Sequence, residues 1–166
     1  FKFHHLPSGL LYQNKVCMIG PGTVIHPEVL EKELATITER GYSVASLKIS
    51  NRAHITLPWH IQQDQLQEKA LAEKKIGTTG RGIGPTYMDK VGRLGVRVSD
   101  LYESPEILKE RLTMLLANKQ ALFSCFDAAD GLGTVEALMA TCQRYADLLK
   151  PFVCDTVPMA HEAMAE

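Results

Sequence analysis

The segment NKVCMIGPGTVIHPEVLEKELATITERGYSVASLKIS, residues 14–50, contains the succession of patterns that decides the fold. An apolar run over 14–20 is typical of a short buried strand that leads into a glycine and proline turn. A helical pattern begins at Pro27, and a second strand pattern covers 42–50. A strand, a helix and a strand at this spacing predict a βαβ unit, in which the two strands lie parallel in one sheet.

The helix of this unit has recognisable ends. Pro27 suits the first helical position, because proline has no N–H group to leave unpaired and its φ is already helical. Leu30, Leu34 and Ile37 are spaced so that they share one face of a helix. Gly41 can adopt the left-handed conformation that ends many helices. The sequence therefore predicts a helix that begins at Pro27 and stops at Gly41.

Helical patterns dominate the rest of the chain. We expect a helix over 57–75, where the sequence becomes increasingly polar. Ser104 is placed to cap a leucine-rich helix, and Thr134 is placed to cap another, which Pro151 ends. A further short helix fits 157–165.

These patterns predict an α/β fold. Residues 1–100 are expected to form part of a mostly parallel sheet with crossover helices, and residues 101–166 an all-helical segment of the same domain. The chain has 166 residues, of which 45% are hydrophobic and 22% charged, and this composition is ordinary for a globular protein with a sizeable core.

Charge and hydropathy exclude several classes of protein. The formal net charge of −1 favours neither nucleic acid nor an anionic membrane as a partner. No apolar run reaches the roughly 18 residues that a membrane-spanning helix needs. The four cysteines are far apart and have apolar neighbours, which is typical of buried free thiols in a reducing compartment. The chain begins without Met or a signal pattern, and we interpret it as a piece of a longer protein.

The stretch IGTTGRGIGPTY, residues 76–87, is the strongest candidate for a binding site. It matches neither the Walker A pattern nor G-x-G-x-x-G. Glycines nevertheless allow the positive φ angles that let backbone N–H groups converge on an anion, and Pro85 favours a helix start beside them. Thr78 and Thr79, which directly precede Gly80, offer hydroxyl donors. Arg81 offers a planar fork that can hold a phosphate or carboxylate with two bonds.

Basic residues gather around this loop, but their presence has more than one explanation. Six of the 18 basic side chains lie between Lys74 and Arg97, against a single acid, Asp89. Such a local cationic site suits a small anion. Alternatively, the loop is only a flexible connector, Lys90 is a solvated charge, and Arg93 pairs with Asp89 at i, i+4.

The run GIGPTYMDKVGR, Gly82 to Arg93, resembles the signature segment of the adenylosuccinate synthetase family, and it matches the pattern G-I-G-P-x-Y-x-x-K-x-x-R at every fixed position. The resemblance covers most of the first hundred residues and is weaker over the helical remainder. Similar strings elsewhere in the chain are HHLPSGLL, MIGPGTVIHPEVL, ISNRAHITLPWH and GVRVSDLY.

This resemblance implies a function. The family condenses IMP with L-aspartate in AMP biosynthesis: GTP, with Mg²⁺, phosphorylates the 6-oxygen of IMP, and the aspartate amine then displaces the phosphate. It implies a cytoplasmic homodimer on a mostly parallel α/β scaffold. By the same resemblance, Thr79 contacts the IMP 5′-phosphate, Arg93 reaches the IMP of the partner subunit, and Lys90 is important for activity.

The departures from the family are equally specific. The resemblance implies a G-D-E-G-K-G loop for GTP and a catalytic histidine upstream of Phe1, and an EGAQG segment downstream of Glu166. We therefore expect the isolated chain to be inactive, with activity in the full-length enzyme. The other hypothesis is a non-catalytic phosphate-binding or interaction module.

The remaining histidines and aromatic residues have simpler interpretations. His4 and His5 are expected in a strand, and His54 in a partly buried packing position. His60 and His161 have no partners at metal-ligand spacing, so no metal site is predicted. The aromatic side chains Trp59 and Tyr87 are expected to fill a core or an interface.

Overall fold

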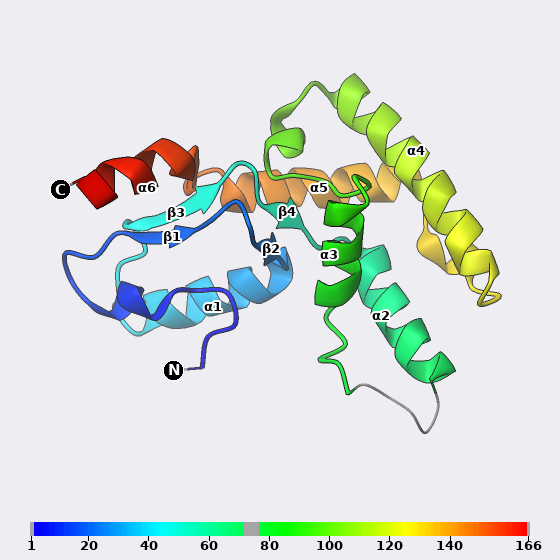
Figure 1. Cartoon of the computed structure of the whole chain (residues 1–166), viewed down its shortest axis with the longest axis horizontal. Coiled ribbons are helices and arrows are strands. Elements are labelled where there is room, and N and C mark those ends of the chain that lie inside the picture. Colours follow the sequence, from blue (N-terminus) through cyan, green and yellow to red (C-terminus); the bar gives the residue numbers. More distant parts are fainter. Residues whose placement is uncertain (1, 72–76, 166) are drawn as a thin grey trace.

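Parallel strands form the centre of the computed structural model, which describes residues 2–71 and 77–165 (Figure 1). In one sheet, β1 (Cys17–Ile19), β3 (Leu47–Ser50) and β5 (Val153–Cys154) lie in the order β1-β3-β5. In the other, β2 (Val24–Ile25) pairs with β4 (His54–Ile55). Every pair of strands in the two sheets is parallel, so the predicted parallel α/β architecture is confirmed.

The predicted βαβ unit is present. Helix α1 (Pro27–Glu39) lies between β1 and β3 in the sequence, and Cys17 is in register with Leu47 across those two strands. Pro27 occupies the first turn, as expected. Gly41 follows the helix with a φ of 81°, in the left-handed region that glycine tolerates best.

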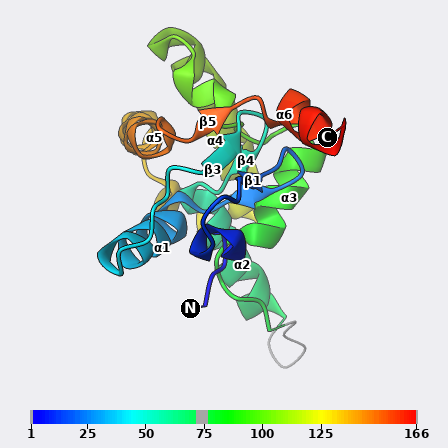
Figure 2. The ribbon, with the colours of Figure 1, turned by 90° about the vertical axis from the view of Figure 1, so that its left-hand side faces the viewer.

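Helices cover both sides of the strands. Figure 2 shows α1 and α5 on one side, and α3 and α6 on the other. Leucine, isoleucine and valine side chains from the strands and the helices form one buried cluster, which also contains Trp59, as predicted. Beyond α1, the helices are α2 (Pro58–Ala70), α3 (Ile83–Val91), α4 (Pro105–Ser124), α5 (Val135–Leu149) and α6 (Thr156–Ala165), with short 3₁₀ turns at Ser8–Leu11, Ser99–Tyr102 and Ala129–Leu132.

The C-terminal segment is helical, as predicted, but it also returns to the sheet. Ser104 and Thr134 cap α4 and α5 by accepting hydrogen bonds from backbone N–H groups. Between α5 and α6, β5 pairs with β3, where the N–H of Ile49 donates to the carbonyl of Phe152 at 2.8 Å. A strand of two residues is too short to show an alternating pattern, and so the sequence did not reveal it.

Two predicted boundaries shift. The helix expected over 57–75 is α2, which ends at Ala70. Residues 72–75, which include Lys74 and Lys75 of the basic cluster, lie outside the described part of the chain. Helix α3 begins at Ile83, so Pro85 lies within its first turn and does not start it.

The assignment of His4 and His5 to a strand was wrong. This segment is irregular because its hydrogen bonds go to a side chain. The buried carboxylate of Glu33 on α1 accepts the backbone N–H groups of His4, His5 and Leu6, at 2.6, 3.1 and 3.0 Å. The segment is thereby fixed against α1 without joining a sheet.

The thiols are also less uniform than expected. Among the described residues all four cysteines are free, but only Cys17 and Cys142 are buried, while Cys154 is half-buried and Cys125 is exposed. A search of residues 2–71 and 77–165 for a helix long and apolar enough to cross a bilayer finds none.

A buried polar cluster joins three of the helices. Asp89 on α3 accepts a bond from Lys119 Nζ on α4 at 2.7 Å, and lies 2.9 Å from His60 Nε2 on α2. The Nδ1 atom of His60 accepts the N–H of Leu57, so Nε2 carries the ring proton and donates a hydrogen bond to Asp89, with the Trp59 indole Nε1 3.0 Å from the same Nε2. Lys119 Nζ also donates to Gln63 at 3.0 Å. The cluster therefore satisfies each of its charged groups inside the core.

Protonation follows from this arrangement. Burial lowers the pKa of His60 despite the nearby carboxylate, which keeps the imidazole neutral. Burial alone would raise the pKa of Asp89, but the bonds from His60 and Lys119 outweigh it and hold the pKa below its ordinary value. The stable state is a charged Asp89–Lys119 pair beside a neutral histidine.

Helix α3 begins where only glycine fits. Gly82 has a φ of 73°, and a Cβ at this position would lie 2.6 Å from the backbone carbon of His60 and 2.7 Å from the nitrogen of Ile61. The N–H of Gly82 donates to Asp64 of α2 at 2.9 Å. The start of α3 therefore rests directly on the backbone of α2.

We predict that Gly82→Ala lowers the free energy of unfolding by about 3 kcal/mol, because the new methyl group meets backbone and the left-handed conformation becomes strained. Urea unfolding measures the change. Gly84→Ala is the matched control: it lies in the first turn of the same helix with open space around its Cα, and alanine there should be neutral or slightly stabilising. Equal effects of the two changes would contradict the account.

The buried His54 on β4 predicts how the stability of the fold depends on pH. Its side chain is buried against Gly95, and burial, followed by the charges of Lys90 and Arg97, lowers its pKa from 6.5 to about 4. As the pH falls, the imidazole of His54 therefore takes up a proton at a higher pH in the unfolded chain than in the folded chain. Its contribution to stability is complete above pH 6.5 and is lost toward pH 4, with a slope of at most about 1.4 kcal/mol per pH unit.

In His54→Gln the free energy of unfolding should fall less steeply between pH 7 and pH 4 than in the unsubstituted protein. Urea unfolding at a series of pH values measures the two slopes. His161→Gln changes an exposed histidine on α6 and is the control. Identical slopes for the His54 variant and the unsubstituted protein would show that His54 titrates normally in the folded state.

Candidate functional site

The glycine loop reaches α3 through three glycines with positive φ. Gly77, Gly80 and Gly82 have φ angles of 78°, 64° and 73°. Their N–H groups, however, are already used: they donate to Glu68, to the Thr78 hydroxyl and to Asp64, respectively. In this arrangement these three amides are not free to bind an anion, because acceptors within the chain satisfy them. The side chains of the loop offer further donors for an anion.

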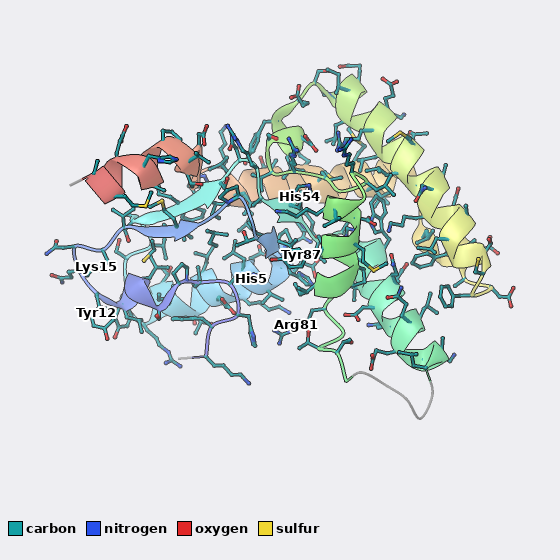
Figure 3. The ribbon with its side chains drawn as sticks, in the orientation of Figure 1. His5, Tyr12, Lys15, His54, Arg81 and Tyr87 are labelled. Atoms are coloured by element: carbon teal, nitrogen blue, oxygen red, sulfur yellow. The ribbon has the colours of Figure 1, made fainter. Side chains whose placement is uncertain are left out.

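Two of those side chains lie in the wall of a cavity. Thr79 and Arg81, both predicted from the sequence, border a cavity of about 490 Å³ between the N-terminal segment and α3. Figure 3 shows Arg81, His5 and Tyr87 around this space. The other lining residues are His4, Pro7, Met18, Ile19, Thr23, Val24 and Ile83.

The cavity combines one fixed cation with neutral donors. Arg81 supplies the positive charge, and its proximity contributes to the lowered pKa values of His5 and His26. Burial is the main cause in both cases, and it brings the pKa of His5 to about 4. His5 is therefore neutral near pH 7. Its Nε2 accepts the N–H of His26 at 3.3 Å, which leaves the ring proton on Nδ1.

This combination suits a phosphate or a carboxylate. A guanidinium can hold two oxygens of such a group at once, and the Thr79 hydroxyl can donate to a third. The apolar part of the wall, which includes Met18, Ile19 and Val24, can contact the remainder of an organic ligand.

Lys90 and Arg93 lie elsewhere. The Nζ of Lys90 donates to the carbonyl of Pro21 at 2.6 Å, and burial, followed by the charge of Arg97, lowers its pKa. Lys90 therefore links the turn between β1 and β2 to α3, while its side chain stays partly exposed.

Arg93 follows the last turn of α3, at the end opposite to the cavity. It is exposed and has a φ of 61°. Arg93 lies outside the helix that the predicted i, i+4 pair with Asp89 would require, since α3 ends at Val91. A pair between Arg93 and Asp89 is also absent from the described ion pairs, because His60 and Lys119 occupy that carboxylate.

Sequence reasoning missed several residues of this cavity. His5 was assigned to a strand, and Tyr87 to a core or an interface. Tyr87 is 41% exposed and borders the cavity. The doublet of His4 and His5 was the only available signal, and nothing in the sequence shows that Glu33 draws this segment toward the loop.

Metal ligands were not predicted on this chain. Within the described residues, no three His, Cys, Asp or Glu side chains come together in an arrangement that could hold a metal ion. The described carboxylates and imidazoles therefore do not fit a Mg²⁺ site of their own.

Comparison with known proteins gives one consistent result. The family model described as adenylosuccinate synthetase matches residues 1–166. The adenylosuccinate synthetase of Bacillus cytotoxicus is 42% identical over 166 residues, which are 100% of this chain and 38% of that protein. That of Thermoanaerobacter sp. (strain X514) is 43% identical over 162 residues, 98% of this chain and 38% of that protein.

A solved structure agrees with these sequences. The fully ligated adenylosuccinate synthetase from Plasmodium falciparum superposes with a TM-score of 0.80 at 31% identity, and the match covers 98% of this chain and 37% of that chain. The chain thus spans less than two-fifths of the length of the relatives it matches. The match to the family model and the superposition on the solved structure agree with the family that the run from Gly82 to Arg93 indicates. The chain belongs to the adenylosuccinate synthetase family.

Proposed function

We propose that this chain supplies the IMP-phosphate contacts and part of the dimer interface of a GTP-dependent ligase that joins IMP and L-aspartate. The observation that carries the proposal is the position of Thr79 and Arg81 in one cavity wall, in a chain that matches the family over its whole length. The product is adenylosuccinate, an intermediate of AMP biosynthesis.

The role of the cavity is to bind and orient. The Arg81 guanidinium holds two oxygens of the phosphate, while the Thr79 hydroxyl donates a hydrogen bond to a third oxygen. Thr78 and Gly80 keep the loop in shape, since the N–H of Gly80 donates to the Thr78 hydroxyl. Held in this way, the nucleotide is immobilised by its phosphate and its base is free to react elsewhere in the enzyme.

GTP supplies the phosphoryl group that activates the 6-oxygen of IMP, and Mg²⁺ assists. The described residues do not form a site for Mg²⁺, so no step on this chain passes through it. We place the GTP and Mg²⁺ contacts, and the catalytic histidine, in the remaining part of a full-length cytoplasmic enzyme. The isolated 166 residues are accordingly proposed to be inactive.

Lys90 and Arg93 have separate roles in this proposal. Lys90 is required for activity because its bond to Pro21 holds the turn that places Thr23 in the cavity wall. Arg93, exposed beyond α3, binds the IMP phosphate of the partner subunit in a homodimer. Arg93 is not among the residues that border the cavity of its own chain, which supports that assignment.

The phosphate contacts can be tested by comparing two ligands. In the full-length protein, the change of both Thr79→Ala and Arg81→Ala should weaken IMP binding about 100-fold and leave inosine binding nearly unchanged, because inosine lacks the phosphate. Isothermal titration calorimetry measures both affinities. A parallel loss for inosine and IMP would contradict the assignment, and a protein that binds IMP without forming adenylosuccinate would support a non-catalytic binding module instead.

The exchange of Arg93 across the dimer predicts complementation. Arg93→Leu and the double alanine variant should each have little activity alone. When the two are mixed and allowed to exchange subunits, half of the dimers are mixed and each mixed dimer has one complete site, so about a quarter of the full activity should return. The rate of adenylosuccinate formation measures the recovery. No recovery after confirmed subunit exchange would show that Arg93 acts within its own subunit.

A further inference from the structure

The phosphate-binding loop is held from its buried side by polar contacts, on the face opposite to the cavity. Gly82, which follows Arg81 directly, has both of its backbone groups fixed: its N–H donates to Asp64 at 2.9 Å, and its carbonyl accepts the Thr86 hydroxyl at 2.6 Å. The Thr86 hydroxyl in turn accepts a bond from Thr56 at 2.9 Å. The loop therefore keeps its position only while α3 keeps its place against α2.

A buried charged side chain also joins α3 to its neighbours. Asp89 lies on the buried face of α3 and is 5% exposed. Its two oxygens are divided between α2 and α4: Oδ2 faces His60 at 2.9 Å, and Oδ1 accepts from Lys119 at 2.7 Å. A short charge-assisted bond of this kind fixes both distance and direction, which apolar packing does not.

Lys119 is the member of this cluster that comes from α4, whereas His60 and Gln63 come from α2 and Asp89 from α3. It lies on α4, 30 residues beyond Asp89, and is 2% exposed. Its other described partner is the neutral Gln63. The Lys119 charge is therefore balanced by Asp89, and loss of either one leaves the other buried without its counter-ion.

We propose that Lys119 is a positioning residue for the phosphate-binding loop: through Asp89 it fixes α3 against His60 of α2, and this keeps Gly82 on Asp64. Thr79 and Arg81 then stay in the cavity wall. This inference rests on the proposed function, because it assumes that the loop binds the IMP phosphate.

Lys119→Met in the full-length protein tests the inference, because methionine keeps most of the apolar stem and removes the charge. The ratio of IMP affinity to inosine affinity should fall about tenfold, while inosine binds as before. The KM for IMP should rise with kcat and the KM for GTP little changed. A lower folded fraction reduces the number of sites for both ligands equally and does not change this ratio.

Lys109→Met is the matched control. Lys109 lies on the same helix, but it is 57% exposed in an ion pair with Glu136, so its loss should change neither the ratio nor the KM for IMP. If Lys119→Met does not fold, the pair Asp89→Asn with Lys119→Met removes both charges and leaves no buried ion unpaired. The ratio should then fall several-fold, since the link between α3 and α4 is still weakened.

The outcomes separate the two proposals. If the unsubstituted protein does not prefer IMP to inosine, the proposed function is wrong and the inference is wrong with it. If that preference exists and a folded Lys119 variant retains it in full, the proposed function stands and the positioning role is refuted.

Discussion

The packing of helices α2, α3 and α4 depends on the contacts of one buried carboxylate, that of Asp89. One oxygen faces His60 on α2, and the other accepts a hydrogen bond from Lys119 on α4. A charge in a core is stable only when its partners are in place, so the three successive helices α2, α3 and α4 must meet at one point. The apolar core supplies the driving force for collapse, and this cluster selects one packing of the helices.

In that packing the two ends of α3 have different surroundings. At its first turn, the glycine loop presents Thr79 and Arg81 to a cavity that the N-terminal segment closes, with Glu33 as the anchor of that segment. Beyond its last turn, Arg93 is exposed and does not border the same cavity. A short helix thereby separates a contact within the subunit from one that we assign to the partner, and Lys90 ties the helix to the strands along the way.

Regular elements were predictable from the sequence, and most buried polar contacts were not. The helix that begins at Pro27 was found because Leu30, Leu34 and Ile37 repeat with the helical period, and the parallel sheet followed from its place between two apolar runs. The strand at Val153 was missed, since two residues carry no period.

The candidate site was predictable only in part, for a similar reason. Thr79 and Arg81 are recognisable because glycine, threonine and arginine occur together and match a family signature. The pairing of Asp89 with Lys119 connects positions that only the fold brings together, and local spacing favoured Arg93 as its partner instead. His5 was missed because a carboxylate on another element determines its position.

The most direct test of the account is a crystal structure of the full-length protein with IMP bound. The account predicts that the 5′-phosphate lies in the cavity, with its oxygens about 2.7–3.2 Å from the Thr79 hydroxyl and the Arg81 guanidinium of one subunit, and with Arg93 reaching it from the other. An IMP phosphate held elsewhere, with Thr79 and Arg81 out of contact, would contradict the account.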